Sequence, residues 1–345
     1  MADQKKRKAA VVSINDVAKL AGVAPGTVSH ALNGVGYVKE ETREKVIRAV
    51  KELNYVPNRA GRILKTTKTK SIMLAIPDTS NEIYFDMIKM VLRTVKKQDY
   101  SMLLYYTGGE YEEEMKVLRM LREKVVDGLF LINFSYEPAL LEEIERVQAP
   151  VVLCGMCNHL WANKGLPFDT ISIDVYKGIY MAVKHLIQMG HRKIGYLAGR
   201  QGVEVYWQRF EAYKAALEDN GIEFREEYVA WNDYSEEGGY ESGNILHQLG
   251  DRPTAICASN DQQAIGCWKA FRDLGDETAL TGLDNLNISK IIGITSFDMK
   301  EGKIGEAAAK ILLEQLHSDK IQHKDMYFVP ELIIRESSIG KRRDV

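Results

Sequence analysis

The sequence predicts an N-terminal all-α helix-turn-helix head followed by an α/β core of two lobes, each built on a doubly wound parallel sheet. Three observations predict this fold class. Residues 13–33 contain two short helical patterns around a glycine turn, and the first 70 residues are far more basic than the rest. From Ser71 onward, short apolar runs alternate with amphipathic helical patterns, which is typical of a parallel sheet covered by helices.

The bulk properties indicate a multidomain protein. A chain of 345 residues exceeds what one hydrophobic core ordinarily supports, so two or three domains are expected. The composition, 45% apolar and 27% charged, is that of soluble globular proteins. No apolar run approaches the ~20 residues that span a bilayer, and no apolar stretch follows the basic start as in a secretory signal. We therefore expect a cytoplasmic protein that does not act at a membrane.

The four cysteines are too few for a disulfide scaffold. Cys154 and Cys157 have the spacing of a redox or metal-binding pair. They lie at the end of an apolar run, however, and no second pair is nearby. We interpret them as thiols within the core, and we expect neither a metal nor a cofactor.

The charge distribution is strongly asymmetric. Residues 1–70 contain 15 Lys and Arg against 6 Asp and Glu, a balance of +9. The remaining 275 residues contain 31 against 42, a balance of −11, which gives the net charge of −2. Binding to the phosphates of DNA needs local positive charge, so this basic head favours a nucleic-acid partner.

The first helix of the head is expected to begin after Ser13. Ser13 and Asp16 have the spacing of a capping box, in which each side chain bonds to the backbone of the other residue. Gly22 stands where a helix ends in a left-handed residue. Together these residues predict a helix of about two turns that ends at a sharp turn.

The second helix is expected to begin at Pro25, because proline suits the first helical turn, where no N–H partner is needed. Val28 and Leu32, four residues apart, would face the head's small core. The residues left outside are polar or small, namely Gly26, Thr27, Ser29, His30 and Asn33. A short polar helix presented in this way can enter the major groove of DNA.

A third helix from Glu40 to Tyr55 is expected to complete the head. Residues 57–65 contain good helix formers interrupted by Gly61, and a helix this short is marginal in isolation. The expected divisions are a basic tail at 1–12, the DNA-binding domain at 13–57, a hinge helix and linker at 58–70, and the core at 71–345.

The core contains two series of candidate strands separated by helical patterns. The first series is Ile72–Ile76, Met102–Tyr106, Leu129–Ile132 and Val151–Cys154. The second series is Ile171–Ile173, Lys193–Leu197, Tyr228–Trp231, Ala255–Ala258 and Leu280–Leu283. Two sheets of four or five strands indicate two lobes, with a ligand bound at the carboxyl ends of the strands between them. Lobe 1 is expected at about 71–170 and 299–328, and lobe 2 at about 171–298 and 329–345.

These motifs, in this order, resemble the lactose/galactose repressor family. The resemblance runs from Ser13 to about Ser337. It is carried by Asp16–Val23, Thr27–Ser29, Glu41–Val46, Leu53–Asn58, Pro77–Asn81, Val126–Gly128, His185–Gly195, Ser259–Asp261 and Gly282–Asp284. It implies a periplasmic-binding-protein-like core and a homodimer that binds a pseudo-palindromic DNA operator. No heptad repeat is present to build a tetramer.

The resemblance also implies which residues contact DNA. The expected positions are Ser13, Pro25, Gly26, Thr27, Ser29, His30, Asn33, Asn58, Arg59, Gly61, Arg62 and Leu64. Leu64 takes the place of a leucine that wedges between bases in the minor groove. His30 stands where arginine is usual and Ala24 where a capping Ser or Thr is usual, so the usual operator preference is not assumed.

The effector site implied by the resemblance lies between the lobes. Its expected residues are Ser80, Asn81, Tyr84, Met156, Trp207, Arg209, Asn260 and Asp284. Arg209 offers fork-shaped donors, and Asn260 offers a donor and an acceptor. Trp207 either stacks on a ligand ring or belongs to the core or the rim. Gly155 and Met156 stand where many relatives have Asp-Arg, so a less polar or larger ligand than a typical hexose is possible.

The leading hypothesis is a transcriptional regulator, most readily a repressor, with a carbohydrate-like effector. An alternative keeps the DNA function and assigns a nucleobase or other metabolite as co-repressor. A small-molecule binding protein without a DNA role is disfavoured by the basic head. An enzyme is not expected, because no phosphate-loop spacing, metal-ligand cluster or nucleophile–base motif is present.

Overall fold

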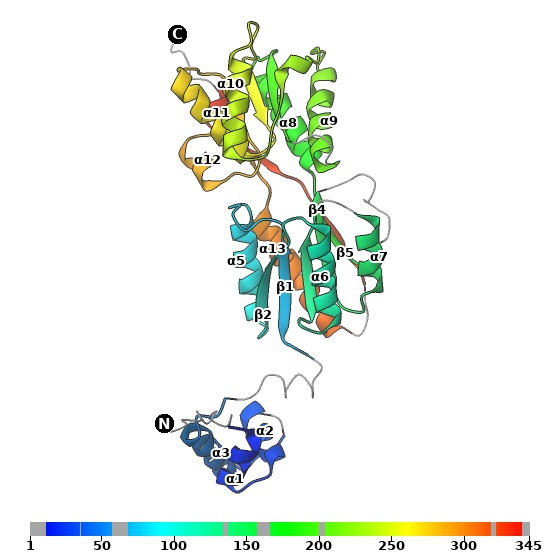
Figure 1. Cartoon of the computed structure of the whole chain (residues 1–345), viewed down its shortest axis with the longest axis vertical. Coiled ribbons are helices and arrows are strands. Elements are labelled where there is room, and N and C mark those ends of the chain that lie inside the picture. The colour runs from blue at the N-terminus through cyan, green and yellow to red at the C-terminus, as the bar shows by residue number, and fades with distance from the viewer. Residues whose placement is uncertain are drawn as a thin grey trace, which may run out of the picture. The chain divides into compact units, whose positions relative to one another are not determined.

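The computed structural model divides the chain into two compact units, Met1–Lys68 and Thr69–Val345 (Figure 1). It describes residues 12–34, 36–56, 68–133, 137–156, 166–199, 204–318 and 322–339. None of the helices formed by these residues is both long and apolar enough to cross a membrane. Each unit is considered by itself below.

The first unit is a three-helix head, as the sequence predicts. Its helices are α1 (Ile14–Ala21), α2 (Pro25–Asn33) and α3 (Glu40–Glu52). One Asp16 carboxylate oxygen accepts hydrogen bonds from the Ser13 N–H at 2.8 Å and from the Ser13 hydroxyl at 2.7 Å. Gly22 has φ = 65°, which ends α1 in the left-handed conformation. The small core is shared by all three helices and consists of Val17, Ala18, Val28, Ala31, Val46, Ala49 and Tyr55.

The first lobe of the second unit is built on a six-stranded sheet in which every pair is parallel. Its strand order is β11-β5-β4-β3-β1-β2. The strands are β1 (Ser71–Ile76), β2 (Ser101–Tyr106), β3 (Gly128–Ile132), β4 (Val151–Met156), β5 (Asp169–Ile173) and β11 (Asp325–Phe328).

Helices cover both faces of this sheet. Successive side chains along each strand point to opposite faces, so each strand supplies apolar side chains to both layers of helices. Ile72 and Leu74 pack with α5 (Tyr84–Lys96) and α13 (Glu301–His317). Met73 and Ala75 pack on the other face with α6 (Tyr111–Arg122) and α7 (Pro138–Arg146). This is the doubly wound arrangement expected from the sequence.

The second lobe has a four-stranded parallel sheet in the order β7-β6-β8-β9. Its strands are β6 (Ile194–Ala198), β7 (Val229–Trp231), β8 (Ala255–Ala258) and β9 (Ala279–Thr281). Helices α8 (Val175–Gln188) and α9 (Glu204–Glu218) pack on one face, and α10 (Glu236–His247) and α11 (Asp261–Leu274) on the other. An antiparallel pair, β10 (Ser296–Asp298) and β12 (Glu331–Ile333), completes the lobe with η1 (Glu226–Tyr228), α12 (Asn287–Ile291) and α14 (Glu336–Ile339).

The structure corrects two predictions about the strands. The first sheet has six strands, where four or five were expected, and one strand belongs to a different sheet from the one predicted. Residues 171–173 were expected in the second sheet, but β5 pairs in parallel with β4 and with β11 in the first sheet. A short apolar run shows that a strand exists and does not show which sheet it joins. The chain passes between the lobes three times, after β5, after β10 and after β11.

Helix α13 follows the second lobe in the chain and yet lies against α5 of the first lobe (Figure 1). The two helices approach closely at Gly305, where an added Cβ atom would lie 2.6 Å from the Met87 carbonyl oxygen. Only glycine permits this distance. The contact fixes the start of α13 beside the start of α5.

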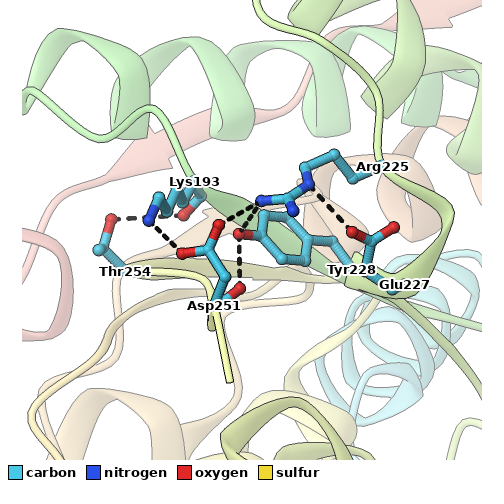
Figure 2. A network of polar contacts seen from close by, with 6 residues as sticks. All are labelled: Lys193, Arg225, Glu227, Tyr228, Asp251 and Thr254. Carbon is cyan, nitrogen blue, oxygen red and sulfur yellow. Dashed lines mark hydrogen bonds and ion pairs between the residues drawn. The ribbon is translucent and has the colours of Figure 1, made fainter. Parts of the chain in front are cut away.

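A polar network joins the amino-terminal ends of the second lobe's strands (Figure 2). Asp251 bonds to Arg225 at 2.7 Å and also pairs with Lys193, while its carbonyl accepts from the Tyr228 hydroxyl at 2.8 Å. Lys193 and Tyr228 directly precede β6 and β7. The charged side chains are between a third and a half exposed, so each pair adds little stability. The network lies at the sheet end opposite to the expected effector site.

Candidate functional site

Helix α2 presents a mostly exposed polar face. Val28 and Ala31 are buried in the head's core, and Leu32 packs against it. Of the residues expected to contact DNA, Pro25, Gly26, His30 and Asn33 are exposed, while Thr27 and Ser29 are partly buried. These α2 residues therefore lie on the outer side of the helix, and α2 is the helix that we predicted from the sequence to enter the major groove.

The first turn of α2 has no side-chain cap. Ala24 is the N-cap residue, with φ = −72° and ψ = 150°, and its methyl group accepts no hydrogen bond. Pro25 follows and carries no backbone N–H. The departure noted in the sequence thus leaves this helix without the stabilisation of about 1 kcal/mol that a capping hydroxyl typically provides.

Two polar side chains of α2 make contacts within the head. The Asn33 amide nitrogen donates to the Ser29 carbonyl at 2.8 Å and lies 3.3 Å from the Ser29 hydroxyl. The His30 ring lies beside the loop after α2, where a Cβ atom added to Gly36 would be 3.4 Å from His30 Nδ1. Ser13, at the start of α1, bonds to Asp16 as described above. The hinge residues Asn58, Arg59, Gly61, Arg62 and Leu64 lie outside the described residues.

In the core, three of the expected effector residues lie close enough for the charge of one to shift the pKa of another. Tyr84 is the first residue of α5, Arg209 lies within α9, and Asp284 follows β9. All three are buried. Burial and then the Asp284 carboxylate raise the pKa of the Tyr84 hydroxyl far above its usual value, with Arg209 acting in the opposite direction. The site therefore contains groups from both lobes.

Asp284 is held in a strained backbone conformation. Its φ is 120° and that of Asn285 is 54°, values that residues other than glycine seldom adopt. Such residues cost on the order of 1–3 kcal/mol each and cluster at ligand sites. Burial raises the pKa of the Asp284 carboxyl well above its usual value, the charge on Asp261 adds to this, and Arg209 partly offsets it.

Asp261 holds the loop that carries Asp284. It is fully buried, and its two oxygens accept from the Leu286 N–H at 2.8 Å and from the Ser296 hydroxyl at 2.6 Å. Its position, directly after the N-cap Asn260, gave no signal of this role in the sequence. Asp261 is thus a positioning residue for the site.

Tyr234 is a site neighbour that the sequence analysis missed. The Arg209 guanidinium carbon lies 5.1 Å from the centre of the Tyr234 ring, within the range of a cation–π contact. Burial disfavours the charged form of Arg209, but Tyr234 and Asp284 outweigh it, so the pKa of Arg209 lies above its usual value. A lone tyrosine after a short strand carries no pattern that would have identified it.

The smaller polar residues mainly shape the site. Asn260 caps α11 through its oxygen, which accepts from Gln263 N–H at 2.9 Å, and its amide nitrogen donates to the Tyr234 carbonyl at 3.0 Å. Ser80 bonds to Asp78 through both its N–H and its hydroxyl, and the Asn81 oxygen accepts from the Ile83 N–H. These bonds fix the loops that precede Tyr84 and follow β7.

The structure does not group Trp207 with Arg209. Trp207 is 52% exposed and packs against Phe210, with ring centres 5.5 Å apart. Trp207 and Arg209 both lie within α9, and residues two apart on a helix point to different sides. Met156 ends β4 beside Ile173, and its side chain lies outside the described set. The described residues include no group of three or more His, Cys, Asp or Glu suited to a metal ion.

Comparison with known proteins identifies this arrangement. The model of "Bacterial regulatory proteins, lacI family" matches residues 13–58, and that of the "Periplasmic binding protein-like domain" matches residues 183–338. The HTH-type transcriptional repressor PurR of Actinobacillus pleuropneumoniae serotype 3 (strain JL03) is 32% identical over 335 residues, which cover 95% of this chain and 98% of the relative. The chain belongs to the lacI family. It is a DNA-binding transcriptional regulator of that family.

Solved structures agree with the fold. A transcriptional regulator CelR–cellobiose complex is 26% identical, with a TM-score of 0.67, over 94% of this chain and 99% of that one. The lac repressor dimer bound to operator and the anti-inducer ONPF is 22% identical, with a TM-score of 0.81, over 95% of this chain and 99% of that one. This lacI-family protein therefore combines the head and the two-lobed core that the sequence predicts.

Proposed function

We propose that this lacI-family chain is a repressor that binds a pseudo-palindromic operator as a homodimer and responds to a small effector held between its lobes. The basic head and the exposed face of α2 support the DNA role. The lobes are joined by three chain crossings, and a ligand that contacted both lobes would favour one orientation of the lobes over others. The expected hinge helix and linker, at residues 58–70, would pass this change to the head.

The effector we propose is a nucleobase, the alternative of the sequence analysis, in place of a carbohydrate. The relative named PurR is more similar to this chain than the cellobiose-bound CelR, at 32% against 26% identity. The environment of Arg209 carries the proposal. Its guanidinium is buried beside the Tyr234 ring and near the Asp284 carboxyl. A flat heterocycle with several donors and acceptors suits such a combination of rings and polar groups.

Calorimetry of the full chain tests the effector class. The probes are adenine, guanine, hypoxanthine and uracil, with ribose, glucose and cellobiose as the competing class. We expect one or more nucleobases to bind and the sugars to show no heat of binding. Binding of a sugar alone would refute the nucleobase assignment and return the effector to the carbohydrate class.

Selection from a random duplex library tests the DNA role. We expect the full chain to enrich a sequence with two inverted half-sites, because a two-fold symmetric dimer presents two α2 helices. The nucleobase that binds in calorimetry should then change the affinity for this duplex. Failure to enrich any sequence, with or without the nucleobases, would contradict the proposed repressor function.

A further inference from the structure

Glu301 is a partly buried residue at the junction of the two lobes, and one oxygen of its carboxyl group is fully buried. It is the first residue of α13 and follows the crossing after β10. A Cβ atom added to the next residue, Gly302, would lie 3.8 Å from the Cβ atom of Asp86 in the first turn of α5. Tyr84 begins that same helix, so the start of α13 lies near the first-lobe part of the effector site.

One oxygen of this carboxyl group has no hydrogen-bond partner among the described residues. Glu301 Oε1 is buried, and no described residue makes a hydrogen bond to it. A buried polar atom without a partner is unfavourable unless something else binds it, so Oε1 points to a ligand.

Glu301 is electrostatically coupled to the effector site. A charge on Glu301 raises the pKa of Asp284, the residue that shares its environment with Arg209. The other charged groups that act on Glu301 are Asp298 on β10, Asp86 on α5 and Lys290 on α12. Burial, with Asp298 and Asp86, raises the pKa of Glu301 to about 8, and Lys290 opposes this. Near neutral pH the group is therefore mainly a neutral carboxylic acid.

We propose that the Glu301 carboxyl group is a further effector contact, which donates one hydrogen bond and accepts another at an edge of the nucleobase. A carboxylic acid has one O–H donor and one carbonyl acceptor side by side. Nucleobases present the complementary pair, an N–H next to a ring nitrogen or a carbonyl oxygen. This inference rests on the proposed nucleobase effector and adds a specificity-determining residue to it.

The test compares Glu301→Gln with Glu301→Leu in the full chain. The amide of Gln keeps one donor and one acceptor but does not ionise, whereas Leu offers neither. Calorimetry with the strongest-binding nucleobase is run from pH 6 to pH 9. Glu306→Gln is the matched control, because Glu306 is on the same helix and pairs with Lys310 at 2.7 Å.

We expect the affinity of the wild-type chain to fall relative to Glu301→Gln above pH about 8, approaching tenfold per pH unit, since only the protonated acid donates. Dividing the affinity of the wild-type chain by that of Glu301→Gln cancels the effect of the ligand's own titration, because both proteins bind the same ligand. At pH 7, the affinity of Glu301→Gln should stay within ~3-fold of the wild-type affinity. The affinity of Glu301→Leu should be ~10-fold lower or more, as expected for lost hydrogen bonds. The control should match the wild-type protein throughout.

The outcomes separate the two proposals. If a nucleobase binds but Leu and wild type have equal affinities and equal pH profiles, Glu301 is not a contact and the nucleobase function stands. If the wild-type affinity rises above pH 8 while Glu301→Gln binds the nucleobase only weakly, the ionised carboxylate is the form that binds, and the proposed hydrogen-bond pairing is wrong. If only a sugar binds, or no probe binds, the proposed effector class fails and the Glu301 inference fails with it.

Discussion

Glu82 and Asn287 join the two lobes beside the proposed effector site. The Glu82 carboxylate, in the loop before α5, accepts a hydrogen bond from the Asn287 backbone N–H at 3.0 Å and a second one from its side-chain amide. Glu82 precedes Tyr84 by two residues, and Asn287 follows Asp284 by three. Ile83, the residue after Glu82, packs against the apolar cores of both lobes. The loops that carry the site residues are thus tied to each other directly.

Replacing Glu82 by Ala should weaken effector binding, because the lobes lose a contact that favours their approach. Asn287 is exposed, so we expect a loss of about 1 kcal/mol, or roughly fivefold in affinity. Calorimetry with the effector measures this. Glu112→Ala, at an exposed position on α6, is the control and should have no effect. Equal affinities of Glu82→Ala and wild type would show that the contact does not contribute to binding.

The head and the two sheets could be predicted because their signals are local. The capping box of Ser13 and the left-handed turn at Gly22 depend on neighbouring residues alone, and the structure confirms both. The strand at 171–173 was assigned to the wrong sheet because its pairing with β4 and β11 is not encoded in its own residues.

Within the site, a similar limit applies. Tyr84, Arg209 and Asp284 were expected from a resemblance of motifs, and the structure brings them into one environment. Tyr234 and Glu301 were missed because their roles come from long-range packing. Glu301 is brought close to the start of α5 because α13 returns to lie against that helix. The Tyr234 carbonyl accepts a hydrogen bond from the Asn260 side chain, which lies after another strand of the same lobe.

Replacing Arg209 by Ala should abolish the effector response while operator binding persists. The side chain is 5% exposed and provides the site's buried cation, so a nucleobase would lose its strongest donor. We expect at least ~100-fold weaker effector binding and operator affinity within ~2-fold of wild type in the absence of effector. Arg209→Lys keeps the charge without the planar fork and should restore only part of the affinity. A normal response in Arg209→Ala would mean that the effector site lies elsewhere.

Replacing Glu301 by Gln should stabilise the protein, and increasingly so at higher pH. The folded-state pKa of Glu301 is raised from 4.5 to about 8, so the wild-type protein loses stability as pH rises through this interval. Gln does not ionise and avoids that loss. One pKa unit is worth about 1.4 kcal/mol, so we expect roughly 2–4 kcal/mol in favour of Gln at pH 8 and little at pH 4. Urea unfolding of the full chain measures the difference, and a pH-independent difference would contradict the assigned burial.

Raising the salt concentration should weaken operator binding strongly and effector binding little. The first 70 residues carry a net charge of +9, and each phosphate that they neutralise releases counterions. Between 50 and 200 mM salt, we expect the operator affinity to fall by ~10³-fold or more. Fluorescence anisotropy with a labelled operator measures this, and calorimetry of the effector is the reference. An operator affinity that is flat over this range would show that the basic head does not bind phosphates.

Replacing His30 by Ala should reduce sequence discrimination without unfolding the head. His30 is exposed on α2, and the ring contributes nothing to the buried core of Val28 and Ala31. A lost base contact is worth about 1–3 kcal/mol, so the affinity for the selected operator should fall ~10-fold while the affinity for a shuffled duplex stays constant. Anisotropy with both duplexes gives this ratio. An equal loss on both would assign His30 to the phosphate backbone, and no loss on either would leave recognition to Thr27, Ser29 and their neighbours.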